Sequence, residues 1–308
     1  MASVGPCCVV GAFAVCAALV FANEVHGVNA LTQLAVVIDW RSVLCWVFML
    51  FCAVLMQAAT NTLNDYQDFK SGLDTAETVL DETDASIVYN HINPKSALVF
   101  ALAQLAVAAV IGVTVALLTS WWLLVWGVVA AAVTVLYSVG PKPISSLPIG
   151  EVVSGVALGG VLTCVTFYAT TLSFSALIVG LALLPTITIA QIMQTNNTCD
   201  IDRDIKAGRR TLPGIIGHRR SALLNAALSV VAFLLLALIL VWSGLFYGLP
   251  VVALGFVICL PKINRLLKGP YDLTNRRTMM GTAVSYNRWL CVTTVVAVLF
   301  GGILNVFI

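Results

Sequence analysis

Two groups of acidic and amide residues stand out in the sequence because of their side-chain types and their spacing. Asn64 and Asp68 are four residues apart, and Asn196, Asp200 and Asp204 repeat the same interval. Residues four apart lie on one face of an α-helix, so each group would form a row of oxygen ligands. Such ligands suit Mg²⁺, which takes one or two carboxylates and completes its shell with phosphate oxygens and water. We therefore expect the two rows to hold Mg²⁺ between them, bridging to a diphosphate.

Four basic residues could act together with the two rows. Lys142 is part of a Gly-Pro-Lys-Pro turn, and Arg203, Lys206 and Arg210 accompany or follow the second row. These side chains could bind phosphate oxygens and neutralise charge that the metal ions leave uncompensated. The alternative is topological, because basic residues are common in the cytoplasmic loops of membrane proteins without any catalytic role.

The remaining ionisable residues carry less information about chemistry. The acids between residues 77 and 84 have the character of a solvated loop. His26, His91 and His218 lie in separate parts of the chain, so no Ser-His-Asp arrangement is visible. An ionised leaving group stabilised by metal ions would need no such triad.

The composition defines the elements that must position these residues. Of the 308 residues, 60% are hydrophobic and only 10% are charged, whereas soluble domains average about 25% charged residues. This excludes a soluble enzyme and a disordered chain. We predict an all-α fold, a polytopic membrane helix bundle that forms a single domain over residues 1–308.

A membrane-spanning helix needs about 20 mostly apolar residues. Both acidic rows directly follow apolar stretches of this length, which is where ionisable groups are usually functional. The sequence predicts about nine transmembrane helices, at approximately residues 5–22, 42–61, 95–118, 121–138, 150–170, 174–196, 221–243, 247–261 and 281–307.

The distribution of basic residues predicts the orientation of these helices. Of the 16 lysines and arginines, 14 fall in or beside the segments 62–94, 139–149, 197–220 and 262–280, which nine spans would place on one side. By the positive-inside rule that side is cytoplasmic. We therefore expect a multi-pass protein of the inner (cytoplasmic) membrane with the N-terminus inside, the C-terminus outside and the acidic rows on the cytoplasmic side.

Three sequence motifs resemble those of the UbiA superfamily of intramembrane prenyltransferases. The order of Asp68, Gly72 and Asp74, the motif that begins at Tyr137, and the Gly150-Glu151 pair after it are similar to its 1,4-dihydroxy-2-naphthoate polyprenyltransferase branch. The motifs read Asn64-Asp65-Tyr66-x-Asp68 with Gly72 and Asp74; Asn196-Asn197-x-x-Asp200-Ile201-x-x-Asp204-x-x-Ala207-Gly208-x-Arg210-Thr211-Leu212; and Tyr137-Ser138-x-Gly140-Pro141-x-Pro143, followed by Gly150-Glu151.

The resemblance implies a helix bundle around a central cavity in which Mg²⁺ and a polyprenyl diphosphate bind. Asp68, Asp200 and Asp204 would be the catalytic carboxylates, and with Asn64 and Asn196 they would be ligands of the metal or the diphosphate. In this branch the aromatic acceptor loses its carboxylate as it is prenylated, giving demethylmenaquinone. The residues expected to support the ligands or contact the acceptor are Asn61, Asp65, Asp74, Tyr137 and Asn197.

Three features depart from the resemblance. The first span lacks the Arg-Pro-x-Thr type entry expected in this branch, Cys199 stands where an arginine is expected before Asp200, and the loop after Asp74 is acidic where basic residues are expected. The expected partners are the bilayer, a polyprenyl diphosphate and an aromatic acceptor, with no nucleic acid. The acidic rows are equally compatible with other acceptors, such as 4-hydroxybenzoate or a haem or chlorin ring. A transporter would instead place ionisable groups within its spans, and here Arg288 is nearly alone in doing so.

Overall fold

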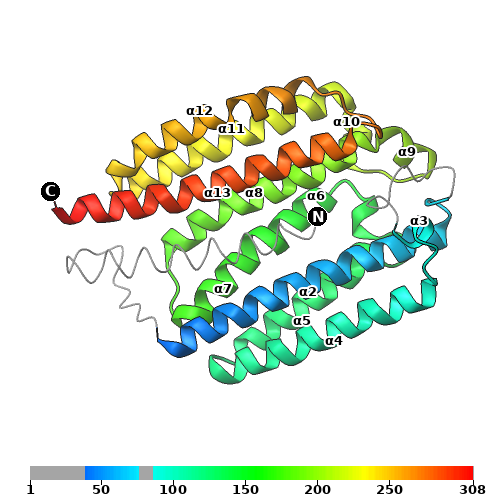
Figure 1. Cartoon of the computed structure of the whole chain (residues 1–308), viewed down its shortest axis with the longest axis horizontal. Helices are drawn as coiled ribbons and strands as arrows, with labels where there is room; N and C mark the ends of the chain where they lie inside the picture. The colour runs from blue at the N-terminus through cyan, green and yellow to red at the C-terminus, as the bar shows by residue number, and fades with distance from the viewer. Residues whose placement is uncertain (1–38, 76–85, 308) are drawn as a thin grey trace.

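The computed structural model describes residues 39–75 and 86–307, and this part of the chain consists of helices and loops (Figure 1). Seven of its helices are long and apolar enough to cross a membrane, and one more apolar helix is shorter. The seven are α2 (Trp40–Ser71), α4 (Pro94–Leu118), the continuous helix Gly150–Thr171, α8 (Ala176–Cys199), α11 (His218–Trp242), Phe246–Lys268, which contains α12 (Leu249–Lys268), and α13 (Arg276–Phe307); the shorter one is α5 (Trp122–Ser138).

These eight helices correspond to eight of the nine predicted spans. The ninth, predicted at residues 5–22, lies outside the described residues, so the count of nine stays a prediction. The all-α membrane bundle itself is confirmed, and the chain is an integral, multi-pass membrane protein.

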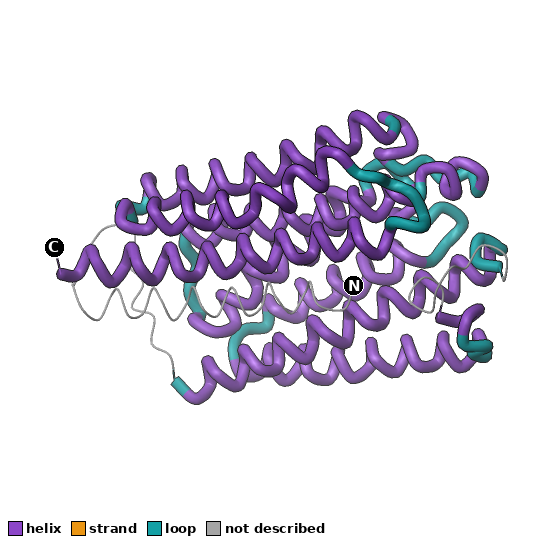
Figure 2. Tube along the Cα trace, turned by 45° about the horizontal axis from the view of Figure 1, so that its top comes forward, coloured by secondary structure: helices purple, strands orange, loops and turns teal. Residues whose placement is uncertain are grey.

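The helices run side by side and form three layers (Figures 1 and 2). In one outer layer α11, α12 and α13 pack against one another and against α8, and in the other α2 packs with α4 and α5. The helix Gly150–Thr171 lies between them and contacts both α8 and α2. Buried apolar side chains fill both interfaces, including Phe167, Leu236 and Tyr286 on one side and Met49 and Val115 on the other.

The short helices gather at one end of this bundle. They are α3 (Ser86–Tyr89), α9 (Ile201–Lys206) and α10 (Leu212–Ile216), and Figure 1 shows all three beside the last turn of α2 and the start of α13. Because α2 and α8 both end here, the fold brings the two acidic rows to the same end of the molecule.

The length and the end of α2 position the first acidic row. With 32 residues and a rise of 1.5 Å each, α2 is about 48 Å long, which exceeds the hydrocarbon thickness of about 30 Å. The helix ends at Gly72, whose φ of +75° favours glycine. This turn folds the chain back, so that the backbone N–H groups of Leu73 and Asp74 both donate to the carbonyl of Asp68.

The helix Gly150–Thr171 approaches α8 very closely. It consists of α6 (Gly150–Ser154), a π-helical segment (Gly155–Val161) and α7 (Leu162–Thr171). A Cβ on Gly155 would lie 2.4 Å from the carbonyl oxygen of Thr186, and one on Gly159 would lie 2.4 Å from the Thr186 nitrogen. Small residues four apart are a common device for close helix contact in membranes, and here they bring the start of this helix beside the end of α8.

Candidate active site

The last turns of α2 and α8 carry the two acidic rows, as the spacing predicts. Within the first row, the Asn64 amide donates to Asp68 Oδ2 over 3.0 Å. Within the second, the Asn196 amide donates to Asp200 Oδ2 over 3.3 Å. Although α8 ends at Cys199, the backbone N–H of Asp204 donates to the Asp200 carbonyl over 2.8 Å, so α9 continues the row. Each row therefore presents its amide and carboxylate side chains on one face.

Arg209, which follows α9, joins the two rows. Its Nη1 lies 3.7 Å from Asp68 Oδ1, and its Nε lies 3.5 Å from Asp204 Oδ1. Its Nη2 also donates to the backbone carbonyl of Ser145 over 3.4 Å. One guanidinium group thus stands between a carboxylate of the first row and a carboxylate of the second, which places the rows opposite each other.

Arg203 forms a second connection between the α9 region and the end of α2. Its Nη2 lies 2.6 Å from Asp74 Oδ1, the short distance of a strong charge-assisted hydrogen bond. The Asp74 side chain is buried at this contact. Asp74 thereby ties Arg203 to the end of α2, and its supporting role for the ligands stays a prediction.

Arg276, at the start of α13, contributes a third guanidinium group that the motif analysis did not single out. Its Nε and Nη2 donate to Asn196 Oδ1 over 3.2 and 3.0 Å, and its Nη2 lies 3.3 Å from Asp200 Oδ2. Cys199 belongs to an apolar cluster with Tyr271 instead. The cation beside Asp200 is therefore supplied by another helix and not by the neighbouring position in the chain.

Burial disfavours the ionised form of Asp200, Asp204 and Asp74. Desolvation raises the pKa of Asp200 to about 7, reinforced by the nearby charge of Asp204 and opposed by Arg203 and Arg209. Desolvation likewise raises the pKa of Asp74 to about 6 against the opposing charge of Arg203, and it raises the pKa of Asp204. Additional positive charge at this site would favour the ionised carboxylates.

The donor chemistry of the two rows fits Mg²⁺. All the side chains offer hard oxygen ligands, and Asp200 Oδ1 is buried without a hydrogen-bond partner. Within residues 39–75 and 86–307, no three His, Cys, Asp or Glu side chains lie close enough together to form a metal site. The arginines between the carboxylates account for this separation.

A buried carboxylate and a phenol lie deeper in the bundle, beside the second row. Glu151 is 2% exposed, and its Oε1 accepts a hydrogen bond of 2.8 Å from the Asn197 amide. Its Oε2 and the Tyr137 hydroxyl are buried as well. Ser154 lies beside the Tyr137 hydroxyl and the Leu212 backbone beside the Glu151 carboxylate, and the hydroxyl is close enough to Glu151 to feel its charge. Buried polar atoms are almost always hydrogen-bonded, and Glu151 Oε2 and the Tyr137 hydroxyl make no well-formed hydrogen bond within the described residues, which makes them candidates to bind a polar ligand.

The other predicted residues occupy the edge of this site. The Asn61 amide oxygen accepts a hydrogen bond of 3.5 Å from Gln57, and Asp65 interacts with Ser86 at the start of α3. The side chains of Lys142, Lys206 and Arg210 are exposed. Their predicted role in binding a diphosphate stays a prediction.

Solved structures share this architecture. The structure of a UbiA homologue from Archaeoglobus fulgidus bound to GPP and Mg²⁺ matches 96% of this chain and 99% of its own, with a TM-score of 0.59 at 15% identity. At that identity the likeness concerns the fold.

Two relatives are similar in sequence. A 1,4-dihydroxy-2-naphthoate octaprenyltransferase of Bacillus subtilis is 38% identical over 62% of this chain, and the match spans only 61% of the relative. A 1,4-dihydroxy-2-naphthoate octaprenyltransferase of Mycobacterium tuberculosis is 29% identical over 68% of this chain and 70% of its own length.

The matched region contains the whole site built above. The model of the UbiA prenyltransferase family matches residues 25–284, which include both acidic rows, Glu151 and all three arginines. The chain that folds into this bundle therefore belongs to the UbiA prenyltransferase family.

Proposed function

We propose that this protein transfers a polyprenyl group from polyprenyl diphosphate to 1,4-dihydroxy-2-naphthoate. The observation that carries the proposal is the pair of amide–carboxylate rows that face each other across Arg209 at one end of the bundle. The choice of acceptor is supported by the names of the two sequence relatives.

The two rows divide the work of holding the donor's diphosphate. Asn64, Asp68, Asn196, Asp200 and Asp204 would hold Mg²⁺, which when bound would stabilise the charge that develops on the leaving diphosphate. Arg209 and Arg276 present guanidinium groups at the same place. Guanidinium groups bind phosphate oxygens through paired hydrogen bonds, so both arginines can exchange a carboxylate partner for the diphosphate.

Glu151 and Tyr137 form the acceptor side. The Glu151 carboxylate would accept a hydrogen bond from a ring hydroxyl, and the Tyr137 hydroxyl would bind a second polar group of the acceptor. The Asn197 amide fixes the orientation of Glu151, because it occupies one carboxylate oxygen. An electron-rich ring held here lies beside the second acidic row.

The bond changes follow from this placement. The allylic C–O bond of the donor breaks, and the diphosphate leaves with the electron pair. The ring carbon that carries the carboxylate forms a new C–C bond to the allylic carbon. The ring then loses CO₂, whose bonding pair restores aromaticity. Apolar walls exclude water, which would otherwise capture the allylic cation. The product is the prenylated naphthalenediol, the reduced form of demethylmenaquinone.

The distribution of basic residues supports a cytoplasmic location for this end of the protein, in the inner membrane. A water-soluble acceptor would then enter from the cytoplasm, whereas the prenyl donor would enter from the bilayer.

The test is an assay of the full-length protein in lipid nanodiscs with Mg²⁺ and a polyprenyl diphosphate. 1,4-Dihydroxy-2-naphthoate and 4-hydroxybenzoate are offered together, and the products are identified by mass. We expect a decarboxylated prenyl-naphthalenediol that disappears on chelation of the metal and falls at least 100-fold in Asp68→Asn. Asp202→Asn is the matched control, because Asp202 lies between two residues of the second row and is exposed.

Two results would contradict the proposal. Prenylation of 4-hydroxybenzoate alone would reject the assigned acceptor. Full activity in Asp68→Asn, or equal loss in Asp202→Asn, would reject the role of the acidic rows.

A further inference from the structure

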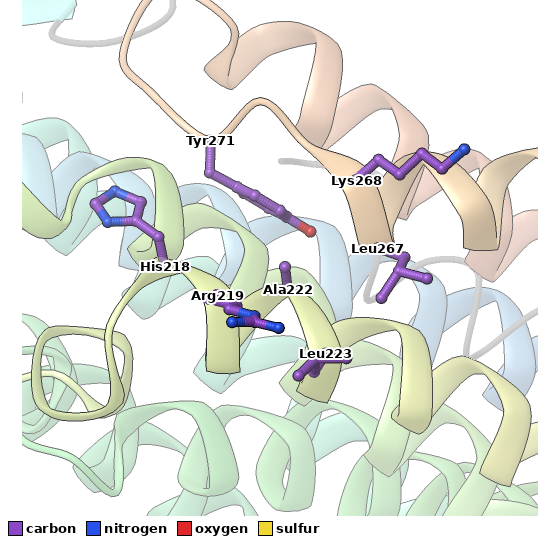
Figure 3. A pocket seen from close by; sticks show the side chains of 7 residues that line it. All are labelled: His218, Arg219, Ala222, Leu223, Leu267, Lys268 and Tyr271. Carbon is purple, nitrogen blue, oxygen red and sulfur yellow. The ribbon is translucent and has the colours of Figure 1, made fainter.

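A hollow lies between the start of α11 and the end of α12, away from the two acidic rows. Its volume is about 500 Å³, and none of the residues that line it belongs to the acidic rows or to the acceptor side. Figure 3 shows the Tyr271 side chain of the segment after α12 pointing towards Ala222 of α11, with the His218 ring and the Lys268 ammonium group extending outward on opposite sides. The lining residues are His218, Arg219, Ala222, Leu223, Leu267, Lys268 and Tyr271.

Two cationic side chains and one imidazole line the hollow. Arg219 and Lys268 come from the two different helices, and His218 adds an imidazole at the first residue of α11. Neither Arg219 nor Lys268 has an ion-pair partner among the described residues, and no carboxylate lines the hollow. α11 also begins without a side-chain cap, so its dipole adds positive potential here. The opening therefore favours an anion.

The floor of the hollow is apolar and rigid. Ala222 and the ring of Tyr271 are buried. The Tyr271 hydroxyl makes two hydrogen bonds, because it accepts one from the Asn225 amide and donates one to the Leu266 carbonyl. Since the floor is fixed by these contacts, the hollow does not depend on a ligand to form.

The wall of the hollow continues onto the apolar outer surface of the bundle. Leu223 is 53% exposed and Leu267 is 41% exposed. Further along the same two helices, Leu234, Leu238 and Leu254 are exposed as well, as expected of side chains that face acyl chains. A ligand here would have its anionic group among cations and its apolar part against leucines.

We propose that this hollow binds an anionic phospholipid, with the phosphate of the headgroup between Arg219 and Lys268 and an acyl chain along Leu223 and Leu267. A free phosphate would satisfy the cations but leave the exposed leucines without a partner. A basic recess between membrane helices at the headgroup level is a suitable site for such lipids.

The test is native mass spectrometry of the full-length protein released from detergent with equal amounts of phosphatidylglycerol and phosphatidylcholine. We expect the protein to retain phosphatidylglycerol preferentially. In the double variant Arg219→Gln/Lys268→Gln, the affinity for phosphatidylglycerol should fall about tenfold or more. The charge-conserving double variant Arg219→Lys/Lys268→Arg should keep the preference.

The matched control is Arg220→Gln/Lys95→Gln, which removes the same charge from exposed positions that do not line the hollow. Equal loss of phosphatidylglycerol in this control would overturn the site, because the effect would then be one of net charge. Separate titrations with inorganic phosphate and diphosphate distinguish the free anions. If these bind with residues 219 and 268 intact while phosphatidylglycerol is not retained, the assignment to a lipid is wrong.

Discussion

At the scale of residues, each arginine of the site is shared between segments that are distant in the chain. Arg209 contacts Asp68 of α2 and Asp204 of α9, and Arg276 connects α13 to the end of α8. Burying a carboxylate without a partner is strongly unfavourable. These ion pairs therefore allow several acids to lie at the same end of a membrane bundle before any metal or phosphate is bound.

Glu151 allows a prediction that separates the acceptor side from the diphosphate side. In Glu151→Gln the side chain keeps its shape but loses the carboxylate oxygen that we assign to the acceptor hydroxyl. We expect the KM for 1,4-dihydroxy-2-naphthoate to rise or kcat to fall, by 10-fold to 1000-fold in kcat/KM, while the KM for the prenyl diphosphate changes less than threefold.

Steady-state kinetics with each substrate varied in turn measures this separation. Asp204→Asn serves as the comparison, because it should weaken the donor side instead. An equal rise in both KM values for Glu151→Gln would contradict an acceptor role and indicate a general loss of structure.

The residues that sequence reasoning could identify are those with a local pattern. Asn64 and Asp68 are four residues apart in the sequence, and so are Asn196 and Asp200. The structure shows a hydrogen bond within each of these pairs. Arg276 has no such pattern, because an arginine at the start of a span also satisfies the positive-inside rule. Its role depends on how α13 packs against α8, which is a long-range property.

At the scale of elements, the close contact of the helix Gly150–Thr171 with α8 holds Glu151 against Asn197. The contact is made where Gly155 and Gly159 face Thr186 and Pro185 of α8. The π-helical turn between these glycines changes the rotation of the helix. Both features are concentrated near the site, as π-helical segments often are.

Gly159→Ala tests this contact. The new methyl group would lie 2.4 Å from the Thr186 nitrogen and 2.5 Å from the Pro185 carbonyl carbon. Both are backbone atoms, so relieving the overlap requires the two helices to move apart. We expect a loss of about 1–3 kcal/mol in stability, seen as a lower midpoint of thermal unfolding in detergent. Prenyl transfer should fall as well, because the end of α8 moves relative to Glu151.

Gly127→Ala in α5 is the control, because a Cβ at that position meets no atom within 4 Å. Its unfolding midpoint should stay unchanged or rise slightly, since alanine is the better helix former. If both substitutions lower the midpoint equally, the close helix contact is not the cause.

Hydropathy predicted the helices better than their ends. The predicted span 42–61 corresponds to α2, which continues for ten further residues to Ser71. Most of those residues are polar, so a search for apolar stretches stops before them, although the helix ends only at Gly72. By contrast the predicted span 150–170 agrees closely with Gly150–Thr171, because both ends coincide with a change in polarity. The π-helical segment Gly155–Val161 could not be predicted, because its sequence shows no change in polarity.

At the scale of the whole molecule, the two ends of the bundle differ in chemistry. The acidic rows and most of the basic residues lie at one end. Trp40 at the start of α2, Trp121 and Trp122 at the start of α5, and Trp242 at the end of α11 are exposed at the other. Tryptophan is enriched at membrane interfaces. The aromatic end and the ionic end therefore fit the two faces of one membrane.

The orientation can be measured with single cysteines at the two ends. Lys95→Cys lies at the start of α4 on the ionic end, and Trp121→Cys lies beyond its other end. We expect an impermeant maleimide to label Trp121→Cys in intact spheroplasts and Lys95→Cys only after lysis. The unmodified protein gives the background from its own nine cysteines. Labelling of Lys95→Cys in intact spheroplasts would reverse the proposed orientation.

The extra length of α2 has a consequence for how two incompatible substrates meet. A helix of about 48 Å carries Asp68 beyond a hydrocarbon layer of about 30 Å. A donor bound there can keep its diphosphate at the depth it already occupies in the bilayer, with its tail still among lipids. The protein then does not have to extract an oily molecule into water or draw a highly charged group into oil. If the proposed function holds, the protein would join a substrate from water to a substrate from the bilayer at the membrane surface.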